Sequence, residues 1–246
     1  MSLSGPEYRH PANSTVRQAI ILLHGYGADG HDLVGLAPQM AEALPGTAFY
    51  SPHAPEPCEM SPSGRQWFSL ASYDPEMMRR APETMSPIHA RLLQGARTAA
   101  PSLQSFIDSI TEKEQIPLER IALVGFSQGA MMAMHVALRQ STSLAAVVGF
   151  SGALVGTEIL HDEVTSRPPM LLVHGDADPV VPYPAMALAE RALRENCVDV
   201  NTVTCQGLPH GIDKHGLSHA IRFLKQSFAL GDHKADHLHD LETRES

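Results

Sequence analysis

Short apolar runs alternate along this chain with longer stretches in which apolar residues recur at helical spacing. The short runs have the length of strands, and most end in Gly, Pro or a small polar residue. They lie at residues 19–23, 48–51, 121–126, 144–150, 170–174 and 198–204. The stretches with helical spacing lie at residues 33–44, 88–110, 128–139, 183–196 and 217–228. Apolar strands joined by helices predict an α/β fold with a mostly parallel central sheet and helices on both faces.

The length of 246 residues and the 43% apolar content suit a single large domain, which we expect at residues 1–230. Residues 231–246 contain few apolar side chains, so we expect a polar, flexible tail there. One irregular segment, residues 52–87, is rich in Pro, Ser and Met and shows no clear period. It is too long for a loop that only connects two elements of a compact domain, which indicates a functional loop.

The charge balance and the apolar runs exclude several classes of partner. The chain has 27 acidic and 18 basic residues and no cluster of Lys and Arg, which argues against binding to nucleic acid or to anionic membranes. No apolar run approaches the ~18 residues that span a bilayer, so an integral membrane protein is not expected. Three cysteines without metal-ligand spacing, and an N-terminus unlike a secretory signal, favour a cytoplasmic protein.

The pattern Gly125-Phe126-Ser127-Gln128-Gly129 is a G-x-S-x-G motif between a predicted strand and a predicted helix. In this context the serine sits on a sharp, strained turn, and the glycines avoid clashes that a Cβ would cause. The turn also places the serine at a helix N-terminus, where amides point at a developing negative charge. We therefore predict Ser127 as a nucleophile.

A serine needs a histidine base, and the base needs a carboxylate to orient it. On such a fold these partners follow in the order Ser, Asp, His. The loop after residues 170–174 offers Asp176 and Asp178; Asp178 lies deeper in the loop and is favoured, while Asp176 resembles a turn-former. His210 lies on the loop after the last predicted strand and is the candidate base.

An oxyanion hole needs two backbone amides near the nucleophile. One belongs to the residue after the serine, here Gln128. The loop His24-Gly25-Tyr26-Gly27, after the first predicted strand, supplies the second, which we assign to Tyr26. A plain tight turn is the alternative interpretation of this loop.

Seven segments of the chain together resemble the phospholipase/carboxylesterase family of α/β-hydrolases. They are LLHGYGADGHDL (22–33), SPHAPEP (51–57), RQWFSL (65–70), LVGFSQGAMMAM (123–134), VVGFSGAL (147–154), LLVHGDADPVVP (171–182) and GLPHGI (207–212). The resemblance implies an α/β-hydrolase fold without a large cap domain. It also implies Ser127, Asp178 and His210 as the catalytic triad, with Asp178 as the acid, and the amides of Tyr26 and Gln128 as the oxyanion hole.

The family includes acyl-protein thioesterases and bacterial carboxylesterases. The thioesterase branch commonly has Asp where this chain has Ser69, and Leu where it has Tyr26, which favours the general carboxylesterase interpretation. We expect a serine hydrolase that cleaves small or medium acyl esters or thioesters through an acyl-enzyme. Lysophospholipase, acyl-protein thioesterase and dienelactone-hydrolase-like activities are the alternatives on this fold, and a binding protein with an inactive site is the alternative from another class.

The irregular segment carries the predicted substrate contacts. We expect it to fold over the mouth of the site, with an acyl groove lined by Trp67, Phe68, Met77, Met78 and Met85. The alternative is that Trp67 packs against the sheet edge. The expected partners are a small-molecule acyl ester or thioester and, for self-association, a second copy in a homodimer. Histidine pairs such as His215 and His219 lack further ligands, so we expect no metal and no cofactor.

Overall fold

The computed structural model describes residues 3–12, 15–71 and 87–242 of the chain. In these ranges the central sheet has the strand order β1-β3-β2-β6-β7-β8-β9. The strands are β1 (Glu7–Arg9), β2 (Gln18–Leu23), β3 (Thr47–Tyr50), β6 (Ile121–Phe126), β7 (Ala146–Phe150), β8 (Met170–Gly175) and β9 (Val200–Cys205). Every neighbouring pair is parallel except β1 with β3, which is antiparallel. The mostly parallel sheet predicted from the sequence is confirmed.

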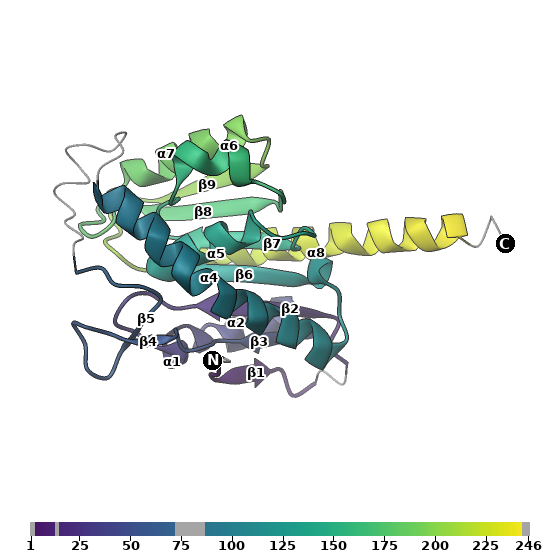
Figure 1. The fold of residues 1–246 in the computed structure, drawn as a ribbon. Helices are drawn as coiled ribbons and strands as arrows, with labels where there is room; N and C mark the ends of the chain where they lie inside the picture. Colours follow the sequence, from purple (N-terminus) through teal and green to yellow (C-terminus); the bar gives the residue numbers. More distant parts are fainter. Residues whose placement is uncertain (1–2, 13–14, 72–86, 243–246) are drawn as a thin grey trace.

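Helices cover both faces of the sheet (Figure 1). One face packs against α4 (Pro87–Glu114), α5 (Gln128–Ala137), α6 (Leu160–Glu163) and α7 (Pro184–Glu195), and the other against α1 (Gly30–Val34), α2 (Ala37–Ala43) and α8 (Lys214–Glu242). Short 3-10 turns, η1 (Leu118–Arg120) and η2 (Thr157–Ile159), precede β6 and α6. None of the helices in the described ranges is long and apolar enough to cross a bilayer.

The two cores follow from the alternation of side chains along each strand. In β2, Ala19, Ile21 and Leu23 belong to the core under α4, α5 and α7, whereas Ile20 and Leu22 belong to the core under α2 and α8. All five are fully buried. Successive side chains of a strand point to opposite faces, so a strand that is apolar throughout needs cover on both sides.

Several elements differ from the sequence-based expectation. A short hairpin, β4 (Glu56–Pro57) with β5 (Arg65–Gln66), lies inside the irregular segment, and β1 adds an antiparallel edge strand. These elements are two or three residues long, too short to show a hydrophobic period. Helix α8 continues through Glu242, and its end projects from the body (Figure 1). The flexible tail and the domain end at residue 230 remain predictions.

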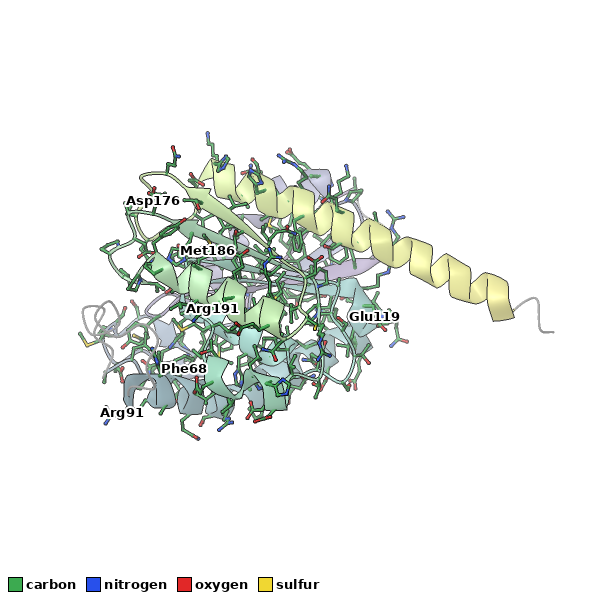
Figure 2. The ribbon with its side chains drawn as sticks, turned by 90° about the horizontal axis from the view of Figure 1, so that it is seen from above. Phe68, Arg91, Glu119, Asp176, Met186 and Arg191 are labelled. Carbon is green, nitrogen blue, oxygen red and sulfur yellow. The ribbon has the colours of Figure 1, made fainter. Side chains whose placement is uncertain are left out.

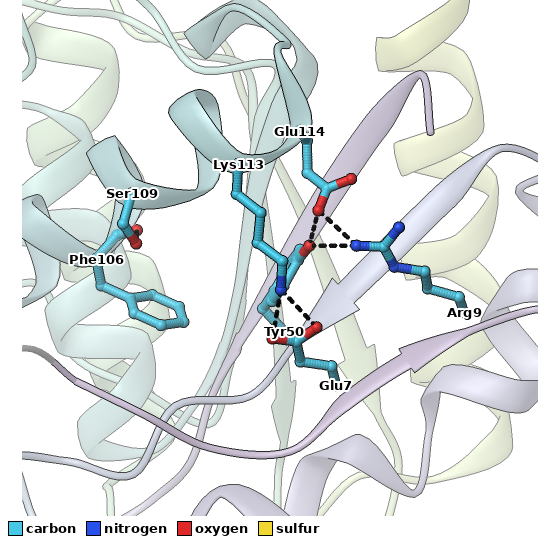
Figure 3. A network of polar contacts seen from close by, with 7 residues as sticks. All are labelled: Glu7, Arg9, Tyr50, Phe106, Ser109, Lys113 and Glu114. Atoms are coloured by element: carbon cyan, nitrogen blue, oxygen red, sulfur yellow. Dashed lines mark hydrogen bonds and ion pairs between the residues drawn. The ribbon is translucent and has the colours of Figure 1, made fainter. Parts of the chain in front are cut away.

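A polar network fastens the end of α4 to the edge of the sheet (Figure 3). The Glu114 carboxylate accepts a hydrogen bond from the Tyr50 hydroxyl and pairs with Arg9 at 2.6 Å. Lys113 pairs with Glu7 at 2.6 Å, and its ammonium lies 4.9 Å from the centre of the Tyr50 ring. Glu7 and Arg9 are the two ends of β1, so the network holds this short strand in place.

A buried histidine makes the stability of the fold dependent on pH. His135 lies on α5 with 1% of its surface exposed, and its Nδ1 has no hydrogen-bond partner among the described residues. Burial, with a smaller contribution from the positive charge of Arg139, lowers the pKa of His135 to about 4. The folded state therefore binds fewer protons than the unfolded state between that value and the ordinary histidine pKa of ~6.5.

We predict that the free energy of unfolding falls as the pH drops from 7.5 to 5, because the unfolded chain gains a proton on His135 that the folded chain does not bind. The contribution of this one group is about 2 kcal/mol over that range. In His135→Leu the fall should be smaller by about this amount, measured by urea denaturation at both pH values. His161→Leu, at an exposed histidine of α6, is the matched control and should keep the parent's pH dependence. An equal fall in His135→Leu and the parent would contradict the prediction.

Candidate active site

The candidate site lies at the edge of the sheet where the parallel strands end. The loops that follow β2, β6, β8 and β9 all leave the sheet at this edge, because parallel strands share their direction. Figure 2 shows Asp176, just after β8, at the end of the molecule opposite Glu119, which precedes β6. The edge brings together the loops that carry Ser127, Asp178, His210 and Tyr26.

Ser127 occupies the turn between β6 and α5 in a strained conformation, with φ 54° and ψ −117°. A positive φ is costly for a residue with a side chain, and such strain is typical of functional sites. The turn is also tight. A Cβ on Gly125 would lie 2.3 Å from the carbonyl oxygen of Gly129, and a Cβ on Gly129 would lie 1.9 Å from that of Leu23. Both glycines of the motif are therefore required by close backbone contacts.

The Asp178 carboxylate and the His210 ring form a direct pair. His210 Nδ1 lies 2.7 Å from Asp178 Oδ2, and the backbone amides of Val180 and Val181 donate to Oδ1 at 2.8 and 2.9 Å. Burial opposes ionisation of the carboxyl, but hydrogen bonds from His174, His210 and Val180 outweigh it and hold the pKa of Asp178 well below its usual range. The carboxylate stays charged and fixes His210 Nδ1 as a donor, which leaves Nε2 as the proton acceptor.

The His210 ring packs against the residue that precedes the nucleophile. The centres of the His210 and Phe126 rings are 4.7 Å apart. This contact brings the ring to the turn that carries Ser127. Among the described contacts, no hydrogen bond joins the Ser127 hydroxyl to the His210 ring. Such catalytic hydrogen bonds often shorten only when substrate binds.

Asp176 occupies a different position from Asp178. Its Oδ1 accepts a hydrogen bond from the amide of Gly207 at 2.6 Å, which links the loop after β8 to the loop after β9. Asp176 is exposed, whereas Asp178 is buried. This is the amide-binding position expected of a turn-forming acid.

His174 is a component of the site that the sequence analysis did not single out. Its ring is 2% exposed, and Nε2 lies 3.0 Å from the carbonyl oxygen of Val181 and 3.4 Å from Asp178 Oδ2. It supports the Asp178 carboxylate from beneath the loop. One feature of the sequence could have identified His174: it is a histidine at the end of an otherwise apolar strand, two residues before Asp176.

The loop after β2 lies against the nucleophile. A Cβ on Gly25 would lie 3.3 Å from the Cβ of Ser127. The backbone amides of Tyr26 and Gln128 have no hydrogen-bond acceptor among the described residues, whereas that of Gly27 donates to the carbonyl of Arg65 at 2.9 Å. Two amides without a protein acceptor beside a serine can bind an oxyanion.

His24 holds this loop from within. It is fully buried; Nδ1 donates to the Gly25 carbonyl at 2.8 Å, and Nε2 accepts from the amide of Ala54 at 3.0 Å. Burial lowers the pKa of His24, so the ring is neutral and one nitrogen can donate while the other accepts.

Trp67 and Phe68 are buried beside the loop, with 1% and 4% of their surfaces exposed. The Trp67 indole N–H donates to the His24 carbonyl at 3.0 Å. The side-chain amide of Gln128 accepts from the Trp67 backbone amide at 2.9 Å and donates to the Phe68 carbonyl at 2.7 Å. These hydrogen bonds hold the segment that carries Trp67 against the turn that carries the nucleophile.

The structure describes two of the five residues that we predicted to contact the acyl chain. Burial gives the Trp67 and Phe68 side chains a packing role, and their contact with substrate remains a prediction. Met77, Met78 and Met85 lie outside the described residues. In the described part of the chain, no group of three or more His, Cys, Asp or Glu side chains is arranged to hold a metal ion.

Comparison with known proteins places the fold and the motifs in one family. Residues 10–228 match the family described as Phospholipase/Carboxylesterase. The chain is similar to acyl-protein thioesterase 1 of Neurospora crassa, with 28% identity over 213 residues that cover 81% of this chain and 82% of the relative. It is also similar to the esterase YpfH of Escherichia coli K12, with 24% identity over 212 residues that cover 85% and 82%.

A solved structure extends the likeness to three dimensions. The crystal structure of esterase PE8 superposes with a TM-score of 0.83 at 36% identity, covering 92% of this chain and 99% of that one. The α/β-hydrolase fold and the family resemblance inferred from the seven sequence segments are both confirmed. The chain belongs to the phospholipase/carboxylesterase family of α/β-hydrolases.

Proposed function

We propose that the protein is a carboxylesterase that cleaves small or medium acyl esters or thioesters through an acyl-enzyme on Ser127. The observation that carries the proposal is the Asp178–His210 pair, joined at 2.7 Å and packed through Phe126 against the strained serine turn. A histidine oriented by a buried carboxylate is the base that a serine nucleophile requires.

The reaction follows from the roles of these groups. His210 Nε2 takes the proton of the Ser127 hydroxyl while the oxygen attacks the acyl carbonyl carbon. The amides of Tyr26 and Gln128 bind the oxyanion that forms. His210 then gives the proton to the departing alcohol or thiol, which leaves the acyl group on Ser127. Water, activated by the same histidine, releases the acid and restores the enzyme.

Acyl-protein thioesterase is the second candidate, because similar relatives from Neurospora crassa, Gibberella zeae and Saccharomyces cerevisiae carry that name. Matched ester and thioester substrates of equal acyl length would separate the two activities through their kcat/KM values. We place the enzyme in the cytoplasm; its three free thiols, Cys58, Cys197 and Cys205, support a reducing compartment. Assembly into a homodimer remains a prediction.

Ser127→Ala should lower kcat for a p-nitrophenyl ester by roughly 10³- to 10⁶-fold, because it removes the nucleophile. The same variant should lose covalent labelling by a fluorophosphonate probe, which the parent should show. Unchanged melting temperature would establish that the loss is chemical. Activity or labelling that survives in folded Ser127→Ala would refute the proposed function.

Replacement of the two neighbouring acids should have unequal effects. Asp178→Asn should lower kcat by roughly 10³- to 10⁴-fold, because an amide neither stabilises a protonated His210 nor selects its donor nitrogen. Asp176→Asn removes the same charge from the same loop and should cost less than about 10-fold, since among the described residues the Asp176 side chain binds only the Gly207 amide. Steady-state kinetics on both variants, with thermal denaturation as the folding check, tests the assignment. A larger loss in Asp176→Asn would reverse it.

Trp67→Phe keeps an aromatic ring in the buried space and removes the N–H that donates to the His24 carbonyl. If this bond holds the oxyanion loop, residues 24–27, in position, kcat should fall roughly 3- to 30-fold, and by the same factor for acetyl and octanoyl esters. If Trp67 instead lines an acyl groove, KM should rise more for the octanoyl ester. Kinetics across a series of acyl lengths therefore decides between positioning and substrate contact.

A further inference from the structure

The carboxylate of Glu59, in the loop between β4 and β5, joins the loop after β2 to the segment after β5. Its Oε1 accepts a hydrogen bond from the Tyr26 hydroxyl at 2.9 Å and from the Leu70 amide at 3.0 Å. The Ser69 hydroxyl lies 2.9 and 2.8 Å from its two oxygens. The Glu59 carboxylate thus connects Tyr26 to Ser69 and Leu70, which lie more than 40 positions later in the chain.

The arrangement is local rather than part of the core. Glu59 and Ser69 are exposed, and Leu70 is half-buried. Polar pairs in water contribute little to the free energy of unfolding, so these bonds act mainly on the conformation of the loops they join. Burial opposes ionisation of the carboxyl, but hydrogen bonds from Ser69, Tyr26 and the Leu70 amide together outweigh it and hold the pKa of Glu59 below its usual value. The acceptor is therefore ionised at neutral pH.

The backbone around Tyr26 is held on both sides. Before it, the Gly25 carbonyl accepts from His24 Nδ1 at 2.8 Å. After it, the Gly27 amide donates to the Arg65 carbonyl at 2.9 Å. Tyr26 lies between these two anchors, its own amide has no acceptor among the described residues, and its side chain is tied by the hydroxyl to Glu59. The Gly25 carbonyl and the Tyr26 amide belong to one planar peptide group. That group is held at the carbonyl by His24 and, through the Tyr26 side chain, by Glu59.

We propose that Glu59 is a positioning residue, which acts through the Tyr26 hydroxyl to hold the Tyr26 amide in the oxyanion hole. This inference rests on the proposed function, because it assigns Glu59 a part in the same reaction. Glu59 touches neither the reacting atoms nor Ser127. Its effect is on the geometry of one of the two oxyanion donors, so it should appear in kcat and not in ground-state binding.

Glu59→Ala tests the proposal. Ala removes both carboxylate oxygens, so the Tyr26 hydroxyl, the Ser69 hydroxyl and the Leu70 amide lose their shared acceptor, and at an exposed position the shorter side chain leaves no buried cavity. We expect kcat to fall roughly 5- to 50-fold, less than the ~100- to 1,000-fold cost of removing an oxyanion donor, with KM within about twofold of the parent. Glu56→Ala is the matched control, because it removes an equal charge three residues away. Among the described residues the Glu56 carboxylate bonds only to the Gln66 side chain, at 3.2 Å, so this variant should keep parental kinetics.

Tyr26→Phe keeps the backbone amide and removes only the hydroxyl. It should reproduce the kcat loss of Glu59→Ala, and the double variant should be no slower than the slower single variant, because both changes break one connection. The affinity of an alkyl boronic acid, which forms a tetrahedral anionic adduct with the serine, should fall in proportion to kcat/KM across the three variants. Rates are divided by the concentration of sites titrated with a fluorophosphonate, so partial unfolding does not count as loss of turnover.

Parental kcat in Glu59→Ala, additive losses in the double variant, or an unchanged affinity for the boronic acid would each overturn the positioning role. A loss that disappears once rates are corrected for titrated sites would overturn it too, because it would then be a matter of folding. These outcomes are distinct from failure of the proposed function, which would show as ester hydrolysis that survives in Ser127→Ala.

Discussion

Five parallel strands, β2, β3, β6, β7 and β8, are buried along almost their whole length and impose the main constraint on this protein. Each strand needs a helix against each face, so the helices divide between the two sides of the sheet. The same common direction brings the loops after β2, β6, β8 and β9 to one edge. Tyr26 and His210, which are 184 positions apart in the chain, lie on loops that meet there because the sheet is parallel.

Precision at this edge comes from close backbone contacts and a few side-chain bonds. Gly129 must approach the Leu23 carbonyl before the nucleophile turn can form, and this approach also brings Gly25 beside Ser127. Gln128 and Trp67 then fasten the neighbouring loop from the buried side, and Glu59 fastens it from the solvent side. The oxyanion loop is therefore held by connections of two kinds, one inside the core and one in water.

The sequence allowed prediction of the parts that follow from local pattern. The strands and helices have characteristic periods, and the serine motif has a fixed position between them, so the parallel sheet and the turn of Ser127 were accessible. His174 and Glu59 were not, because each acts through contacts that no periodicity records. Glu59 meets Tyr26 across 33 positions and Ser69 across 10, and the short hairpin that brings them together has too few residues for a pattern. The burial of Trp67 was equally inaccessible, since an aromatic residue in an irregular segment can face the core or a ligand.

The edge strand β1 has a consequence for how copies of the chain meet one another. It is three residues long, and the charged side chains at its two ends are engaged by Lys113 and Glu114 of α4. A sheet edge invites a foreign strand when it offers a long row of free backbone groups, and short edges bearing charges discourage this. On this side the sheet is closed to extension. At high concentration the protein is therefore protected at the β1 edge from aggregation by strand addition.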